Sequence, residues 1–140
     1  MNVLYMLDTN MVSYIAKGQS QAARARMLNL GNDEVVCLSA ITEAEIRYGL
    51  AKRPEAAALR ERMDWFLAAV NVLPWGREEA KAYGLLRAKL ESSGQTLENM
   101  DMQIAAHAIA TGAVLVTNDK AFARVDDLHA TVNWATDLGN

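Results

Sequence analysis

The chain has 140 residues, of which 51% are hydrophobic and 22% charged, and its formal net charge is −3. That length fits one compact domain over residues 1–140, long enough to bury its apolar surface without a structural metal. The single cysteine excludes an internal disulfide, and no apolar run is long enough to span a bilayer, so we expect a cytoplasmic protein that makes no membrane contact.

Short apolar runs alternate with stretches of helical periodicity along the whole chain. Gly18, Pro54, Pro74, Gly94 and Gly112 mark the breaks between them. The pattern predicts, in chain order, a strand at 2–7, helices at 9–17 and 21–30, a strand at 34–39, helices at 42–51 and 55–70, a strand at 71–73, helices at 77–92 and 99–111, a strand at 113–117 and a last short strand at 132–134.

This alternation predicts an α/β fold, a three-layer α/β/α sandwich around a central, mainly parallel sheet. Ligands of such sheets bind beyond the carboxyl ends of the strands. Asp8, Ser39 and the pair Asn118-Asp119 all fall at predicted strand ends. We therefore expect the chemistry at that edge.

Three acidic residues stand out by their position. Asp8 directly follows the first apolar strand, although an Asp there also suits a helix N-cap. Asp119 follows the run 114–118, where a turn aspartate is the alternative. Asp101 shares a helix face with small apolar residues, which predicts that its carboxylate points inward and does more than complement the helix dipole.

The helix predicted at 42–51 offers a fourth acid. Thr42-x-x-Glu45 fits a capping box, in which the glutamate would bond back to the helix start. Glu43 competes with Glu45 for an inward position, and spacing alone does not choose between them.

Convergent carboxylates need a cation, and hard oxygen donors suit Mg²⁺ or Mn²⁺. Zinc is disfavoured, because His107 and His129 stand alone and Cys37 lies in an apolar run, where we expect an inert thiol. The sequence has neither a phosphate-binding loop nor a nucleophile paired with a histidine, which leaves metal-activated water as the mechanism. The net charge does not argue against nucleic acid: with four of the 17 acids set aside as ligands, 13 remain against 14 basic residues.

Four segments, in order and at family spacing, resemble the PIN domain of VapC-type toxins from type II toxin–antitoxin pairs. Residues 6–10 resemble its opening L-D-T-N, residues 39–49 its S-x-x-T-x-A-E-L-R-Y-G, residues 101–108 its D-x-x-I-A-A-x-A, and residues 115–119 its L-V-T-N-D. The resemblance covers nearly the whole chain. Residues 98–100 depart from it, since they lack the Gly or Pro that often precedes the third acid.

The resemblance implies a PIN-like fold and an endoribonuclease that cleaves structured RNA, a tRNA or an rRNA, leaving a 5′-phosphate. Asp8, Glu45, Asp101 and Asp119 would then be the catalytic metal ligands for Mg²⁺, with Mn²⁺ as a substitute, and the ligand role falls on Glu45 rather than Glu43. Such a mechanism agrees with general metal chemistry, because a bound divalent ion lowers the pKa of its water and so supplies hydroxide for the attack on phosphorus. Residues placed to orient the carboxylates or to contact phosphate are Thr9, Asn10, Ser39, Thr117 and Asn118, for each of which a cap or turn role is the alternative.

The partners that the resemblance implies are an identical subunit and a VapB-type antitoxin, assembled as a homodimer or a toxin–antitoxin hetero-oligomer that contacts DNA only through the antitoxin. Candidates for an apolar groove or dimer face, each of which also suits the core, are Leu28, Leu30, Leu59, Trp65 and Phe66. Candidates for an RNA path are Arg24, Arg26, Arg47, Lys52 and Arg53.

Other functional classes remain open on the residues alone. A phospho-receiver signalling domain also places acids at strand ends, but Thr9 follows Asp8 where a receiver has an acidic pair, and Ser39 ends the middle strand. A haloacid-type phosphatase needs D-x-D, which Asp8-Thr9-Asn10 does not supply. A non-catalytic interaction module on the same scaffold is the remaining alternative.

Overall fold

The computed structural model describes residues 2–139 and contains one five-stranded parallel sheet with strand order β3-β2-β1-β4-β5. The strands are β1 (Val3–Leu7), β2 (Glu34–Ser39), β3 (Asn71–Leu73), β4 (Val114–Val116) and β5 (Ala130–Val132). Every neighbouring pair runs parallel, so all carboxyl ends lie at one edge of the sheet. The predicted α/β class with a parallel sheet is confirmed.

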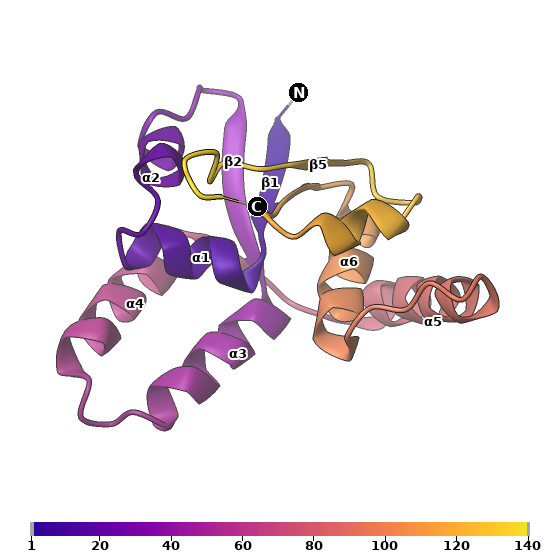
Figure 1. Cartoon of the computed structure of the whole chain (residues 1–140), viewed down its shortest axis with the longest axis horizontal. Coiled ribbons are helices and arrows are strands. Elements are labelled where there is room, and N and C mark those ends of the chain that lie inside the picture. Colours follow the sequence, from indigo (N-terminus) through magenta and orange to yellow (C-terminus); the bar gives the residue numbers. More distant parts are fainter. Residues whose placement is uncertain (1, 140) are drawn as a thin grey trace.

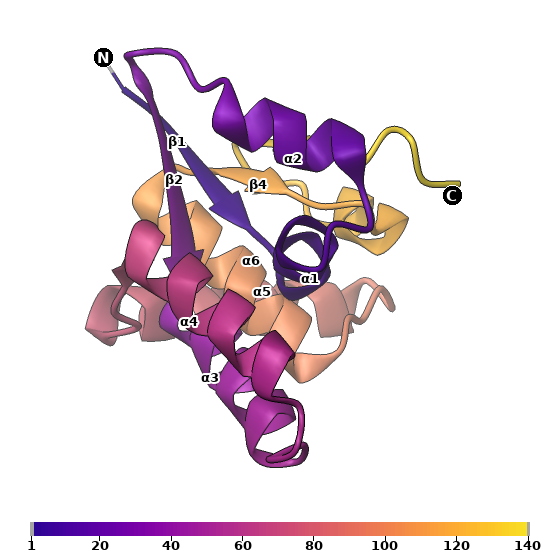
Figure 2. The ribbon, with the colours of Figure 1, turned by 90° about the vertical axis from the view of Figure 1, so that its left-hand side faces the viewer.

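Helices cover both faces of this sheet (Figures 1 and 2). They are α1 (Thr9–Ala16), α2 (Gln21–Leu28), α3 (Ala40–Ala51), α4 (Ala57–Ala69), α5 (Arg77–Ser92) and α6 (Asn99–Thr111), with the 3-10 helix η1 (Lys120–Arg124) after β4. None of the helices within residues 2–139 combines the length and the apolar character needed to cross a membrane.

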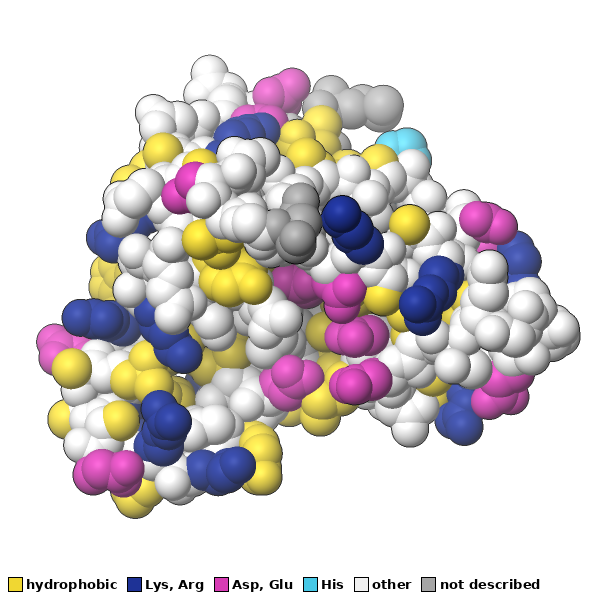
Figure 3. Space-filling view, viewed as in Figure 1, with side chains coloured by type: hydrophobic (Ala, Val, Ile, Leu, Met, Phe, Trp, Pro, Cys, Tyr) yellow, Lys and Arg dark blue, Asp and Glu magenta, His cyan; other side chains and the backbone are white. Residues whose placement is uncertain are grey.

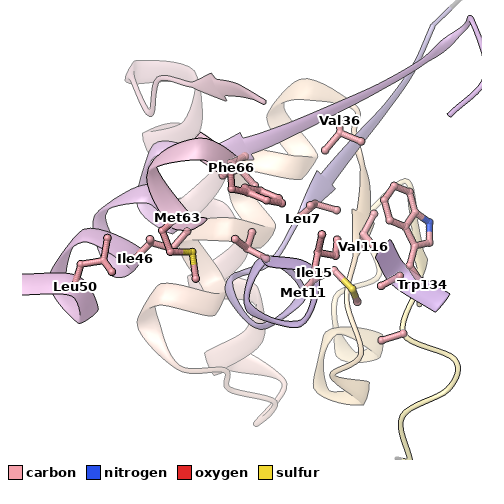
Figure 4. Close-up of a cluster of buried hydrophobic side chains, with 14 residues drawn as sticks. Leu7, Met11, Ile15, Val36, Ile46, Leu50, Met63, Phe66, Val116 and Trp134 are labelled. Carbon is pink, nitrogen blue, oxygen red and sulfur yellow. The ribbon is translucent and has the colours of Figure 1, made fainter. Parts of the chain in front are cut away.

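Alternate residues of the central strands face two separate apolar clusters, as the two-residue period of a strand requires. Leu7 and Leu38 belong to the cluster that α1, α2, α3 and α4 complete, shown in Figure 4 with Phe66 of α4 inside it. Met6 and Cys37, one residue earlier on the same strands, belong to the cluster under α5 and α6. Both faces of the sheet are therefore buried, which gives the three predicted layers.

Several element ends differ from those expected, each for a local reason. Helix α3 begins at Ala40 rather than at residue 42, because the Ser39 side chain caps it by accepting a hydrogen bond from the Ile41 amide (3.1 Å). Helix α2 ends at Leu28, where the Asn29 side chain donates to the Ala25 carbonyl (2.7 Å).

The last strand also lies earlier than predicted, at Ala130–Val132 instead of 132–134. Trp134 is buried in the cluster beside α1 and packs against Tyr5, with ring centroids 5.3 Å apart. Its apolar signal therefore came from core packing rather than from a strand. Gly112 ends α6 as predicted, since it adopts the left-handed conformation with φ of 71°.

Candidate metal centre

A pocket of about 540 Å³ opens at the carboxyl edge of the sheet. Acidic side chains gather there at the centre of one face of the molecule (Figure 3), where α1, α3 and α6 approach one another (Figure 1). Its lining is mostly polar and consists of Asp8, Thr9, Asn10, Glu45, Glu98, Asn99, Met100, Asp101 and Asp119. All four acids singled out in the sequence thus meet in one place.

Asp8 is the most buried member of the pocket, with 5% of its surface exposed. Its Oδ1 accepts a hydrogen bond from the Met11 amide (2.8 Å) and its Oδ2 one from Thr117 Oγ1 (2.5 Å). Burial raises the pKa of the Asp8 carboxyl, and these two hydrogen bonds oppose the rise. Asp8 is therefore both the N-cap of α1 and a carboxylate of the pocket, so the two interpretations of this residue are compatible.

Asp101 lies in the first turn of α6 and is half-buried. Burial raises the pKa of its carboxyl to about 6, and the negative charges of Asp119 and Asp8 add to the effect, followed by those of Glu98 and Glu45. The predicted inward orientation agrees with this burial. The electrostatic repulsion shows that carboxylates from four separate segments act on one another at this site.

Glu45 lines the pocket, whereas Glu43 forms an ion pair with Arg47 (2.7 Å) on α3. The capping box expected at Thr42-x-x-Glu45 is absent, because Ser39 is the N-cap and Thr42 already lies inside the helix. Glu45 is thereby free to face the site. Helix spacing alone did not choose between the two glutamates. In the structure, Glu45 lines the pocket and Glu43 does not.

Asp119 is exposed and lines the pocket from the end of β4. Its carboxylate accepts a hydrogen bond from the Ala121 amide (2.9 Å) and caps η1. Its own amide donates to Thr117 Oγ1 (3.0 Å), so Thr117 contacts both strand-end aspartates.

The remaining candidate side chains divide into two groups. Thr9 and Asn10 line the pocket, and the buried Thr9 Oγ1 has no hydrogen-bond partner. Ser39 and Asn118 do not line it: Ser39 is wholly buried against His107, and Asn118 accepts a hydrogen bond from Asn133 Nδ2 (2.7 Å).

Glu98 is the pocket acid that sequence reasoning missed. It precedes α6 as its N-cap residue, three positions before Asp101, and its charge contributes to the raised pKa of Asp101. The only signal was this spacing, which places residues three apart on one side of a helix start. Asn99 and Met100 enter the pocket with it.

The donor set fits a divalent cation. Within residues 2–139, no three His, Cys, Asp or Glu side chains come close enough together to form a ready-made ligand group. The pocket nevertheless offers carboxylates whose mutual repulsion a cation would relieve, together with an unpartnered hydroxyl on Thr9. Such oxygen donors match Mg²⁺ or Mn²⁺.

The soft and nitrogen donors lie elsewhere, as predicted. Cys37 is buried in the sheet, where burial raises the pKa of its thiol to about 12. His107 is buried and His129 is exposed, and neither lines the acidic pocket.

A second hollow of about 770 Å³ lies between α1, α2 and α4. Leu28 and Trp65, with 71% and 68% of their surfaces exposed, line it together with the buried Phe66. Leu30 and Leu59, which we also considered for a groove, pack instead against the core. The charged residues of the lining are Lys17, Arg24, Glu61 and Arg62.

The basic residues considered for an RNA path have different surroundings. Arg26 forms an ion pair with Glu34 and lies over the rings of Tyr5 and Trp134. Arg47 forms an ion pair with Glu43. The others are Arg24, which lines the apolar hollow, Lys52, whose Nζ lies 5.2 Å from the Tyr48 ring centre, and the exposed Arg53.

The chain is similar to known proteins over nearly its whole length. Residues 5–128 match the family described as PIN domain. Ribonuclease VapC2 of Rickettsia felis is 33% identical over 94% of this chain and 98% of its own length, and the tRNA(fMet)-specific endonuclease VapC of Shigella flexneri is 32% identical over the same shares. The toxin fold in the crystal structure of VapBC2 from Rickettsia felis, bound to a promoter DNA fragment, superposes with a TM-score of 0.88 at 32% identity, covering 94% of this chain and 99% of that one.

Proposed function

Because this chain belongs to the PIN-domain family, among its VapC-type ribonucleases, we propose that it is a divalent-metal-dependent endoribonuclease. The observation that carries the proposal is the pocket in which Asp8, Glu45, Asp101 and Asp119 meet at the carboxyl edge of the sheet. We further propose that residues 1–140 act as one domain.

The four acids would hold Mg²⁺ or Mn²⁺. When bound, such an ion supplies an activated water at neutral pH and offsets the negative charge that develops on the phosphate. The chain's own contribution is orientation: the Met11 amide and Thr117 hydroxyl fix both oxygens of Asp8, and Thr117 also fixes the backbone of Asp119. Thr9 and Asn10 are placed to bind a phosphate oxygen or a metal-ligating water.

We propose structured RNA, a tRNA or an rRNA, as the substrate. The support is the sequence similarity to a relative named as a tRNA(fMet)-specific endonuclease. Exposed cations such as Lys52 and Arg53 would contact the phosphate backbone without selecting a sequence.

We propose a VapB-type antitoxin as the regulatory partner and the hollow between α1, α2 and α4 as its docking groove. Large exposed apolar side chains, Leu28 and Trp65, are the kind of anchor that protein interfaces bury. Three cations and one acid in the lining favour a partner segment with acidic residues beside its apolar face. The similarity to toxin–antitoxin complexes, one of them bound to DNA, supports a hetero-oligomer that contacts DNA through the antitoxin, with this chain as a homodimer within it.

A cleavage assay tests the enzymatic proposal. Purified protein is incubated with a transfer RNA pool in Mg²⁺ or Mn²⁺, or in excess chelator. We expect fragments with 5′-phosphate ends only when the metal is present. Asp101→Asn should be inactive under all conditions, with an unchanged circular dichroism spectrum. Cleavage that continues in chelator would contradict metal dependence.

A further inference from the structure

One buried side-chain hydrogen bond links the two helices that bring Glu45 and Asp101 to the pocket. His107 Nδ1 of α6 lies 2.7 Å from Ser39 Oγ, the N-cap of α3. Their side chains are almost completely enclosed, with 1% and 0% of the residue surfaces exposed. No other side-chain hydrogen bond joins the segment from Ser39 through α3 to α6 in the part of the chain that the structure describes.

The Ser39 hydroxyl can cap α3 and hydrogen-bond to His107 at the same time. Its oxygen accepts from the Ile41 amide, which leaves its hydroxyl hydrogen available to donate to His107 Nδ1. Burial lowers the pKa of His107, which favours the neutral ring that can accept this hydrogen.

Because Glu45 and Asp101 lie some distance along their helices from this hydrogen bond, a small change in helix orientation at the bond would move the two carboxylates relative to each other. Glu45 follows Ser39 by six residues and Asp101 precedes His107 by six, so each carboxylate-bearing residue lies about 9 Å along its helix from the link. Helices α3 and α6 pack against each other, and Glu45 lies close enough to raise the pKa of Asp101. A tilt of about 10° at the link would displace one carboxylate from the other by roughly 1.5 Å.

We infer that His107 is a positioning residue, which sets the separation of Glu45 and Asp101 through its hydrogen bond to Ser39. This inference rests on the proposed metal-dependent function. It assigns the histidine no contact with substrate or metal: His107 acts through the capping serine of α3. Side chains that hydrogen-bond directly to metal ligands typically change metal affinity about 10-fold to 100-fold when removed. Because His107 acts one contact further away, through Ser39, we expect an effect at the lower end of that range.

A matched pair of substitutions separates the hydrogen bond from the packing. Asn and Leu branch at the same carbon, but only Asn places a hydrogen-bonding atom where Nδ1 stands. The measurement is the dissociation constant for Mn²⁺, determined by calorimetry on the full chain without RNA. Thermal denaturation confirms that each variant is folded at the assay temperature.

We expect His107→Leu to bind Mn²⁺ about tenfold more weakly than the native protein, and His107→Asn to stay within about twofold of it. Leu is the better helix former, so this order is the reverse of what helix propensity alone would give. In the Ser39→Ala background, the two His107 variants should bind alike, and Ser39→Ala alone serves as the test should His107→Leu not fold.

The outcomes distinguish this inference from the proposed function. If the native protein binds no Mn²⁺, the proposed function is overturned and the positioning role falls with it. If the native protein binds Mn²⁺ and His107→Leu binds it equally well, or His107→Asn is weakened as much as His107→Leu, only the positioning role is overturned.

Discussion

Thr117 Oγ1 donates a hydrogen bond to Asp8 Oδ2 across 2.5 Å, although 109 positions separate the two residues in the sequence. The contact joins the ends of β1 and β4, which are neighbours in the sheet. The same Thr117 oxygen accepts from the Asp119 amide. One hydroxyl thus orients two of the four proposed metal ligands.

Removing this hydroxyl should weaken the site without removing a carboxylate. Thr117→Val keeps the shape of the side chain but leaves Asp8 Oδ2 without its donor. We expect RNA cleavage and Mn²⁺ affinity to fall about tenfold, and the pKa of Asp8 to rise further, because this hydrogen bond opposes the effect of burial. Thr117→Ser, which restores the donor, is the control. Equal loss in both variants would point to packing instead.

Neutralising Asp101 should make the metal-free protein more stable while abolishing RNA cleavage. In chelator, the half-buried carboxylate is repelled by Asp119 and Asp8, so Asp101→Asn should raise the melting temperature by about 3 °C, or ~1 kcal/mol. The same variant should lose RNA cleavage. Asp64→Asn, on the exposed surface of α4, should change neither quantity. A lower melting temperature for metal-free Asp101→Asn would contradict the repulsion.

The raised pKa of Asp101, about 6 against an ordinary 3.8, predicts opposite pH effects on stability and metal binding. Between about pH 4 and 6, the metal-free folded protein binds more protons at this carboxyl than the unfolded chain does, so its stability should fall as the pH rises. A bound cation requires the ionised form, so Mn²⁺ affinity should increase about fivefold from pH 5 to 6, reach about ten times its pH 5 value near pH 7, and level off above that. Calorimetric titration at these pH values checks the second trend, which equal affinities at pH 5 and 7 would refute.

The apolar groove should bind the antitoxin independently of the acidic pocket. Trp65→Ala should weaken binding of the proposed VapB-type antitoxin at least tenfold, because a large exposed anchor is lost. RNA cleavage by the free variant should be unchanged. Leu85→Ala removes a similarly exposed apolar side chain from α5, outside the groove, and should bind the antitoxin normally. Interferometry with the immobilised antitoxin measures both, and unaltered binding by Trp65→Ala would place the partner elsewhere.

The gathering of the four acids could be predicted because parallel strands bring their carboxyl ends to one edge. Asp8 and Asp119 followed from that topology, and Asp101 from the apolar face that it shares on α6. Glu45 could not be separated from Glu43 without the resemblance, since the start of α3 depends on a cap at Ser39 that the apparent capping box at Thr42 obscured.

Contacts between distant segments were beyond sequence reasoning. Neither Ser39 nor His107 carries a local pattern that predicts their hydrogen bond, because the pairing arises only when α6 packs against the end of β2. Asn118 was a candidate to orient the carboxylates or to contact phosphate, with a turn role as the alternative, and its hydrogen bond from Asn133 of the C-terminal segment had no local signal. Glu98 has no hydrophobic periodicity to mark it, because it lies outside the helix that it precedes.

The most direct test is anomalous diffraction from a crystal of the native protein grown with manganese. We predict a manganese peak in the pocket at the carboxyl edge of the sheet, bound by carboxylate oxygens that include those of Asp8 and Asp101, and no such peak in Asp101→Asn. A pocket without manganese in the native crystal, or a peak bound only by residues outside it, would contradict the proposed metal site.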